Sequence, residues 1–211
     1  ILRISLPLIP HALVGIIISL SDRFFIDRMI CVDALGVYAV GSQFGMAMLL
    51  MLTAFNRSWS PWVYQKLANS STEAKVKIVQ ATYIYALVAF LLACGVTLIS
   101  YFLIPFMTTK PFYGATAFVG WISFGYAFHG LYTMIFPLYV HVGRTSFLAI
   151  ITFFTAVFCL VANYSLIKLN GTIGAAQSLL LSYIVMFLGV WWYSNRVFPM
   201  PWFSKALWSN R

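Results

Sequence analysis

One short stretch holds the densest group of polar side chains in the sequence. Between positions 19 and 28 lie two serines, two aspartates and two arginines: Ser19, Ser21, Asp22, Asp27, Arg23 and Arg28. The stretch follows a long apolar run, and charge so close to hydrocarbon is costly unless it is paired, hydrated or functional. Arginine suits phosphate because its planar guanidinium donates two parallel hydrogen bonds. Arg23 and Arg28 are therefore candidate ligands for an anionic headgroup, with Asp22 or Asp27 balancing charge or taking up a cation.

The same residues also have a purely structural interpretation. Arg23 and Asp27 are four positions apart, so on a helix they share one face and can form an ion pair. Asp22 and Arg28 are six positions apart and cannot form that pair on a regular helix. The stretch would then hold one ion pair and two interfacial charges, with no ligand. The sequence leaves both interpretations open.

A second polar site follows the next apolar run, at Asn56-Arg57-Ser58. Arg57 could contact an anionic ligand, with Asn56 beside it. The alternative is an interface anchor, whose aliphatic stem lies in the apolar zone while the guanidinium reaches water. The three histidines are scattered and lack the spacing of metal ligands on a helix. We therefore expect no metal, no catalytic residue and no enzyme activity.

The elements that position these residues are predicted to be membrane helices. Of the 211 residues, 62% are hydrophobic and only 8% are charged, which excludes a water-soluble domain of this size. Runs of about 20 apolar residues can cross a hydrocarbon core of about 30 Å as helices. We predict an all-α integral membrane protein in which residues 1–211 form one bundle, with spans near 4–20, 34–55, 78–106, 112–140, 146–167 and 172–193. The intervening stretch 56–77 is predicted to be wet, with 57–66 along the membrane interface.

Two smaller patterns bear on how the spans pack and turn. Gly41 and Gly45 form a G-x-x-x-G pattern, which lets helix backbones approach closely in lipid. We interpret it as ordinary helix packing. Asn163 and Asn170 flank the last predicted loop, and we interpret both as capping and turn residues.

The basic residues predict the orientation. The formal net charge of +9 comes from residues spread over short loops, which favours anionic lipid headgroups as partners over nucleic acid. If the first helix leaves the cytoplasm, the inner side collects nine basic residues: Arg3, Arg57, Lys66, Lys75, Lys77, Arg144, Arg196, Lys205 and Arg211. The outer side collects four: Arg23, Arg28, Lys110 and Lys168. Because short cytoplasmic loops are rich in Lys and Arg, we predict that both ends of this segment are cytoplasmic.

Several strings together resemble one transporter family. In the first third of the chain they are SLPLIPH (5–11), SDRFFIDR (21–28), LGVYAVG (35–41) and AFNRSWSPW (54–62). These are similar to the opening of the second half of bacterial polysaccharide flippases. Those are the O-antigen and exopolysaccharide transporters of the multidrug/oligosaccharidyl-lipid/polysaccharide (MOP) exporter superfamily. NYSLIKLNGTIGAA (163–176), followed by Ser182-Tyr183, resembles the last two helices of that fold.

The resemblance implies a MATE/MOP-like transporter of two similar bundles, of which this chain, beginning at Ile1, is the C-terminal one. Its partner would be a missing N-terminal bundle. Such proteins flip an undecaprenyl-diphosphate-linked oligosaccharide across the bacterial inner membrane for surface polysaccharide and lipopolysaccharide biosynthesis. Many are driven by a cation gradient, so H⁺ or Na⁺ would be the coupling ion in place of a cofactor. The resemblance points to Arg23 and Arg28, with Asp22 and Asp27, as part of a cationic cavity.

Three other interpretations compete with a flippase. A cation-coupled multidrug extruder of the same superfamily would use buried acids and aromatic rings, and we expect no clearly membrane-buried acid in this bundle. An integral membrane glycan-lipid enzyme would need a clustered polar site, whereas the wet stretch 56–77 holds one acid and no histidine. The third is the remnant of a broken gene.

Overall fold

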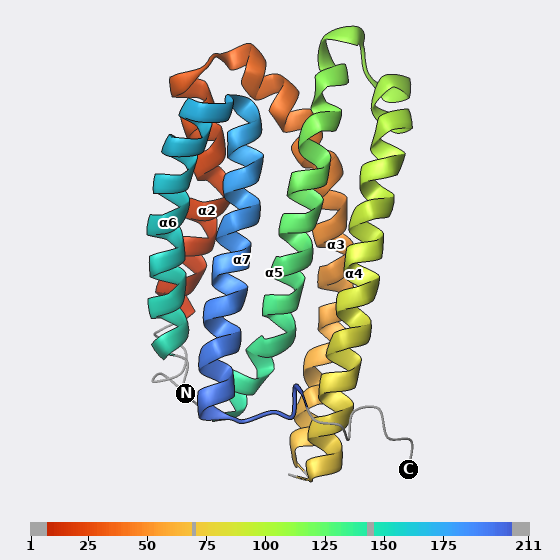
Figure 1. Ribbon diagram of the computed structural model, residues 1–211, viewed down its shortest axis with the longest axis vertical. Helices are drawn as coiled ribbons and strands as arrows, with labels where there is room; N and C mark the ends of the chain where they lie inside the picture. The colour runs from red at the N-terminus through yellow and green to blue at the C-terminus, as the bar shows by residue number, and fades with distance from the viewer. Residues whose placement is uncertain (1–7, 69–70, 143–145, 204–211) are drawn as a thin grey trace.

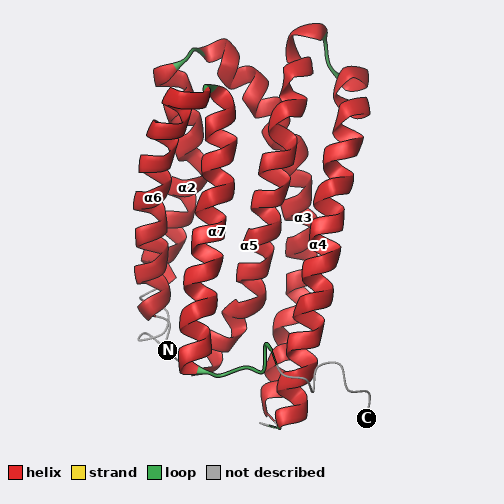
Figure 2. Ribbon diagram, in the orientation of Figure 1, coloured by secondary structure: helices red, strands yellow, loops and turns green. Residues whose placement is uncertain are grey.

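Six long helices run side by side in the computed structural model, which describes residues 8–68, 71–142 and 146–203 (Figures 1 and 2). They are α2 (Leu8–Met29), α3 (Val32–Ala68), α4 (Thr72–Met107), α5 (Thr116–Val142), α6 (Ser146–Asn170) and α7 (Thr172–Val197). A short 3-10 helix, η1 (Lys110–Ala115), joins α4 to α5. No strand occurs in the described residues, so the predicted all-α class is confirmed.

The helices have the length and surface of membrane spans. Four of them (α3, α4, α6 and α7) are long and apolar enough to cross a bilayer. Large apolar side chains cover their outer faces; Phe102 and Phe106 on α4 are 80% and 87% exposed. Water would penalise such a surface, whereas lipid chains accommodate it. The protein is therefore embedded in a membrane. The spans predicted at α2 and α5 coincide with long helices, and their crossing of the bilayer stays a prediction.

The helix ends differ from the predicted spans in two places. The first helix continues to Met29 instead of ending near residue 20. The second continues to Ala68, so residues 57–66 extend the second helix, and their position along the membrane interface stays a prediction. A buried stripe at Leu52, Trp59 and Val63 keeps this segment packed on the bundle, and the ring of Pro61 lies on the exposed side. Trp59 also donates its indole N–H to the carbonyl of Met134 at 3.0 Å.

Some residues used for the sequence predictions lie outside the described part of the chain. These are residues 4–7 of the first predicted span and four of the nine basic residues assigned to the inner side: Arg3, Arg144, Lys205 and Arg211. Within the described residues, α2 begins and α7 ends at the same end of the bundle (Figure 1). This agrees with an even number of crossings.

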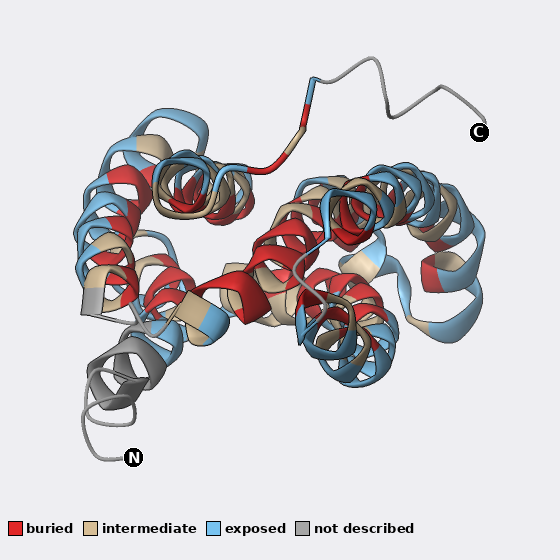
Figure 3. Cartoon of the chain, turned by 90° about the horizontal axis from the view of Figure 1, so that it is seen from below, coloured by how far each residue is buried: buried red, intermediate tan, exposed pale blue. Residues whose placement is uncertain are grey.

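The helices form two groups that meet along α5 and α7. Helix α5 packs against α3 and α4 on one side and against α7 on the other, while α6 packs against α7 and α2. Seen from below, the buried segments face inward where the helices meet, and the exposed faces point outward (Figure 3). The core therefore runs along the bundle through α5.

Two glycine positions show how the sequence permits this packing. A Cβ on Gly41 would lie 2.7 Å from the carbonyl oxygen of Ala115, and a Cβ on Gly45 would overlap the side chain of Ile122. The predicted close approach at the G-x-x-x-G pattern is confirmed, with α5 and η1 as the partners. At the other sharp turn, Gly171 alone links α6 to α7 with a φ of 63°, a conformation that favours glycine.

Candidate functional site

Asp22 is the buried centre of the first polar stretch. It lies on α2 with only 5% of its surface exposed. The hydroxyl of Tyr38, on α3, donates a hydrogen bond to its Oδ2 at 2.6 Å. The backbone N–H of Arg23 donates to its Oδ1 at 2.8 Å. Tyr38 is itself fully buried, so this bond joins α2 to α3 inside the protein.

The burial of this carboxylate needs those donors. An unpaired charge taken from water into a protein interior costs several kcal/mol, and hydrogen bonds to each oxygen offset part of that cost. In the described residues the ion pair found within 4 Å joins Lys77 to Glu73. Asp22 therefore has no cationic partner at that distance among them. The expectation that this bundle has no clearly buried acid is therefore wrong.

A second set of polar contacts starts from Ser21, the residue before Asp22, and joins α2 to α6. Asn163 donates its side-chain N–H to the hydroxyl of Ser21 at 3.0 Å and lies 3.5 Å from the sulfur of Cys159. The hydroxyl of Ser178, on α7, donates to the carbonyl of Cys159 at 3.3 Å. Asn163 is 1% exposed, so the interpretation of this residue as a turn or capping residue is wrong. Asn170 does lie at the turn, where it donates to Gln177.

Aromatic rings of α3, α5 and α7 extend the polar region through the core. The rings of Tyr126 and Tyr183 are 5.9 Å apart, and His129 lies 4.9 Å from Tyr183. Tyr38 packs against Phe118 at 5.5 Å. Asp22 is therefore one member of a buried acid–tyrosine cluster that joins both helix groups.

Arg23 and its neighbours do not form the expected ion pair. Arg23 is half-buried, and its Nε is buried without a hydrogen-bond partner among the described residues. Asp27 is exposed to the outside of α2, where an ion pair gains little, and the structure gives no Arg23–Asp27 contact within 4 Å. Arg28 is also exposed and lies 5.9 Å above the ring of Phe24. The predicted ion pair between Arg23 and Asp27, on which the structural interpretation of this stretch depended, is therefore not formed.

The second polar site is not brought near the first. Asn56 lies 18 positions beyond Tyr38 on the same helix, which corresponds to about 27 Å at 1.5 Å per residue. Asn56 is half-buried, and its Oδ1 has no partner among the described residues. Arg57 is exposed. The six predicted site residues therefore fall into two separate groups at different heights in the bundle.

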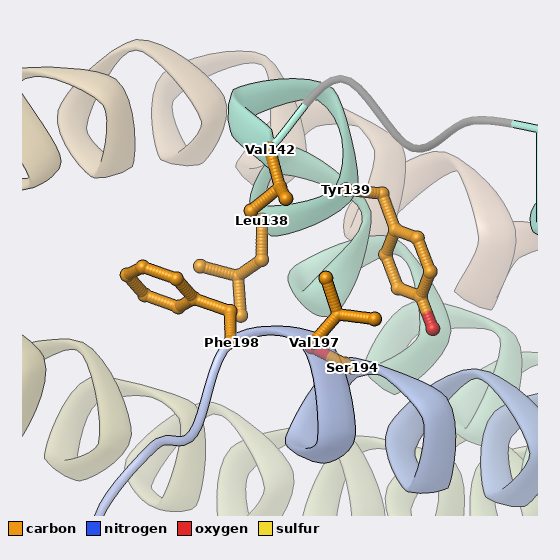
Figure 4. Close-up of a pocket in the computed structure, with 6 residues that line it drawn as sticks. All are labelled: Leu138, Tyr139, Val142, Ser194, Val197 and Phe198. Carbon is orange, nitrogen blue, oxygen red and sulfur yellow. The ribbon is translucent and has the colours of Figure 1, made fainter.

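The hollows in the structure differ greatly in size. The one between the ends of α5 and α7, lined by Leu138, Tyr139, Val142, Ser194, Val197 and Phe198, has about 10 Å³ of space (Figure 4). That is room for about one water molecule, so it is no ligand site. A larger one of about 460 Å³ lies between α4, α5 and α7. In the described residues no three His, Cys, Asp or Glu side chains come together as a metal site requires.

Sequence reasoning did not find Tyr38 and Asn163 as partners of the polar stretch. Each is a single polar residue in an apolar run, which is the available signal, because a polar group inside a membrane must find a partner. The partner itself lies 16 positions away for Asp22 and 142 positions away for Ser21. Only the fold shows which helices meet.

No family model, curated protein or solved structure matches this chain.

Proposed function

We propose that this chain is the C-terminal bundle of an alternating-access flippase that moves an undecaprenyl-diphosphate-linked oligosaccharide across the inner membrane of a bacterium. The observation that carries the proposal is the charged pair of neighbours Asp22 and Arg23, drawn into the interior of a membrane protein. Ionisable residues in such positions mostly serve a ligand or an ion pathway. The family resemblance of the sequence supplies the class of cargo.

The chemistry of Arg23 fits a diphosphate. Its guanidinium carries five N–H donors, and the buried Nε has no acceptor among the described residues. Arg28 lies five positions further along α2, about 7.5 Å towards its end, and offers a second donor fork. Asp22 keeps the local charge from becoming wholly positive and is a candidate for the coupling H⁺ or Na⁺.

The bundle also fits half of a transporter. A lipid-linked diphosphate is too polar to cross hydrocarbon unaided. Transporters built of two repeats solve this by rocking the repeats about a site between them, which alternately opens to each side. We assign the second repeat to a partner bundle and, from the count of basic residues, both ends of this segment to the cytoplasm. A polar site near one end of α2 and α3 would then lie towards the outer side.

A cation-coupled multidrug extruder is the second candidate, and one observation favours it. Asp22 lies beside Tyr38 and belongs to a cluster with other tyrosines, and a carboxylate among aromatic rings suits an organic cation. The buried acid therefore removes the main sequence argument against this candidate.

The test uses the full-length gene product in a bacterial strain that lacks it. Arg23→Ala together with Arg28→Ala should reduce surface polysaccharide at least about tenfold, the effect of losing about 1.4 kcal/mol of binding. Lys110→Ala, an exposed cation of η1, is the matched control and should leave polysaccharide unchanged. Protein levels in the membrane are measured for each variant.

Two outcomes would contradict the proposal. A normal amount of surface polysaccharide in the variant with Arg23→Ala and Arg28→Ala would show that these arginines do not form the cargo site. Loss of drug resistance in Asp22→Asn, with surface polysaccharide unaffected by deletion of the gene, would favour the extruder.

A further inference from the structure

His129 brings an imidazole to the buried acid–tyrosine cluster. It lies on α5, where it is half-buried. Its ring is 4.9 Å from that of Tyr183 on α7, and the ring of Tyr183 is 5.9 Å from that of Tyr126. Histidine is the side chain that gains and loses a proton near neutral pH. Ionisable residues inside membrane bundles are rare and mark ion or proton pathways.

The two tyrosines lie between His129 and Asp22. The charge of the Asp22 carboxylate acts on the hydroxyls of both Tyr126 and Tyr183. Both tyrosines are buried, with 6% and 8% of their surface exposed. Electrostatic interactions are stronger in such an interior than in water, because the effective dielectric constant is lower. A change of charge at Asp22 therefore reaches the tyrosines, and His129 is in contact with one of them.

His129 lies further from the α2–α3 junction than Tyr126 does. Helix α5 begins at the end of the bundle where α2 meets α3 (Figure 1). His129 is three positions beyond Tyr126 on this helix, which corresponds to about 4.5 Å along the axis. Residues three and seven positions apart share a helix face, so His129 and the half-buried Thr133 continue the face of Tyr126. The polar groups thus run from Asp22, near one end of the bundle, towards its middle.

Access to water differs along these groups. Asp22, Tyr126 and Tyr183 are buried, whereas His129 is half-buried. In a transporter with a site between two bundles, that site is open to water from one side at a time, so water reaches the imidazole more easily than the carboxylate. Tyrosine hydroxyls both donate and accept hydrogen bonds. Arg23, also half-buried, cannot pass a proton on, because its guanidinium stays charged.

We propose that His129 is a second proton-binding residue of the bundle and exchanges its proton with Asp22 through Tyr183 and Tyr126. The imidazole takes one proton from water and gives one to the hydroxyl of Tyr183. Each hydroxyl accepts one proton and donates another, and the carboxylate of Asp22 becomes a neutral acid. This inference rests on the proposed transport function and deepens it, because it makes H⁺ the coupling ion.

The titratable and charged groups that face this path come from the neighbouring helices as well as from α5. Beside the two tyrosines of the path they are Asp22 and Arg23 on α2, Tyr38 on α3, Tyr85 on α4, Tyr132 on α5 and Cys159 on α6. Asp22 is the acid of this set, and a nearby negative charge favours the protonated imidazole. Neutralising Asp22 should therefore make His129 lose its proton at a lower pH.

The first experiment is an NMR titration of the full-length protein in lipid nanodiscs, with its histidines labelled with ¹³C and ¹⁵N. The signal that disappears in His129→Gln identifies His129. In the wild type this imidazole should titrate between about pH 5 and 8. In Asp22→Asn the midpoint should fall by about one pH unit, the size expected for two charges in a protein interior. Asp27→Asn, at an exposed position of α2, is the matched control and should leave the midpoint unchanged.

The second experiment follows protons in sealed vesicles that hold the full-length protein, a polyprenyl-diphosphate-linked glycan and a trapped pH-sensitive dye. Under an imposed pH gradient, proton movement should accompany exposure of the glycan. Tyr126→Phe with Tyr183→Phe keeps both rings and removes both hydroxyls, so it should slow proton movement at least about tenfold. Tyr101→Phe, at an exposed ring of α4, is the control and should match the wild type.

The outcomes separate this inference from the transport function. It would be overturned by a His129 midpoint that is the same in Asp22→Asn and the wild type, or by unchanged proton movement in the double tyrosine variant. Glycan exposure that responds to a Na⁺ gradient and not to a pH gradient would also overturn it and leave the transport function standing. Absence of glycan exposure under any gradient would contradict the transport function, while the titration still decides whether Asp22 and His129 are coupled.

Discussion

The carboxylate of Asp22 can stay inside the bundle because a tyrosine from another helix meets it. Removing that donor leaves a buried charge short of one hydrogen bond, with a penalty of about 1–3 kcal/mol. We expect Tyr38→Phe to lower the free energy of unfolding by this amount, measured by thermal or denaturant unfolding in detergent. Tyr101→Phe, at an exposed ring of α4, should change it little.

The background of Asp22→Asn separates this charge effect from simple packing. Asparagine is neutral, so the loss of the Tyr38 donor should cost less there than beside a carboxylate. A cost of Tyr38→Phe that is the same in both backgrounds would show that the hydroxyl acts through packing and that Asp22 is not charged in the folded protein.

The polar stretch could be located from the sequence, but its internal contacts could not. Charges at positions 22–28 after an apolar run are visible without any structure. Which of the two aspartates is buried depends on the face of α2 that meets α3, and helix spacing alone favoured the pair Arg23–Asp27. Tyr38 and Asn163 reach the site from other helices, so their role follows only from the packing.

The contact of α3 with η1 and α5 depends on two glycines of α3, Gly41 and Gly45. A methyl group at Gly45 would overlap Ile122, so the helices must separate or distort to accept it. We expect Gly45→Ala to destabilise the protein by about 1–3 kcal/mol in detergent unfolding.

Gly95 offers the matched control for this contact. It lies on α4 with no heavy atom within 4 Å of a Cβ placed there. Gly95→Ala should leave stability unchanged or raise it by up to about 1 kcal/mol, since alanine favours the helix. Equal effects of the two substitutions would mean that Gly45 is not at a close helix contact.

Hydropathy predicted the helices well because each apolar run must satisfy its backbone within a helix. It predicted their ends poorly, because a helix may continue beyond the hydrocarbon. α3 shows this most clearly: Arg57, Ser58 and Pro61 end the apolar run, yet Trp59 and Val63 continue the buried face to Ala68. The side of each helix that faces lipid likewise could not be predicted from hydropathy, because core and lipid-facing residues are equally apolar.

The orientation of the molecule can be tested with its own cysteines. Cys31 is exposed at the junction of α2 and α3, Cys94 is exposed on the long apolar helix α4, and Cys159 is buried. Thiols react as thiolates, which form in water. With both ends in the cytoplasm, a membrane-impermeant maleimide should label Cys31 in cells whose outer membrane has been permeabilised. Cys31→Ser should abolish the label, and labelling that requires lysis of the inner membrane would reverse the orientation.

The transport of a lipid-linked oligosaccharide is tested most directly with the purified full-length protein in vesicles. A polyprenyl-diphosphate-linked glycan is placed in the vesicle membrane under an imposed cation gradient, and an external lectin measures how fast the glycan becomes accessible. We predict exposure clearly faster than in protein-free vesicles, and as slow as in those vesicles for Arg23→Ala with Arg28→Ala. Glycan exposure by the wild type no faster than in protein-free vesicles would contradict the account.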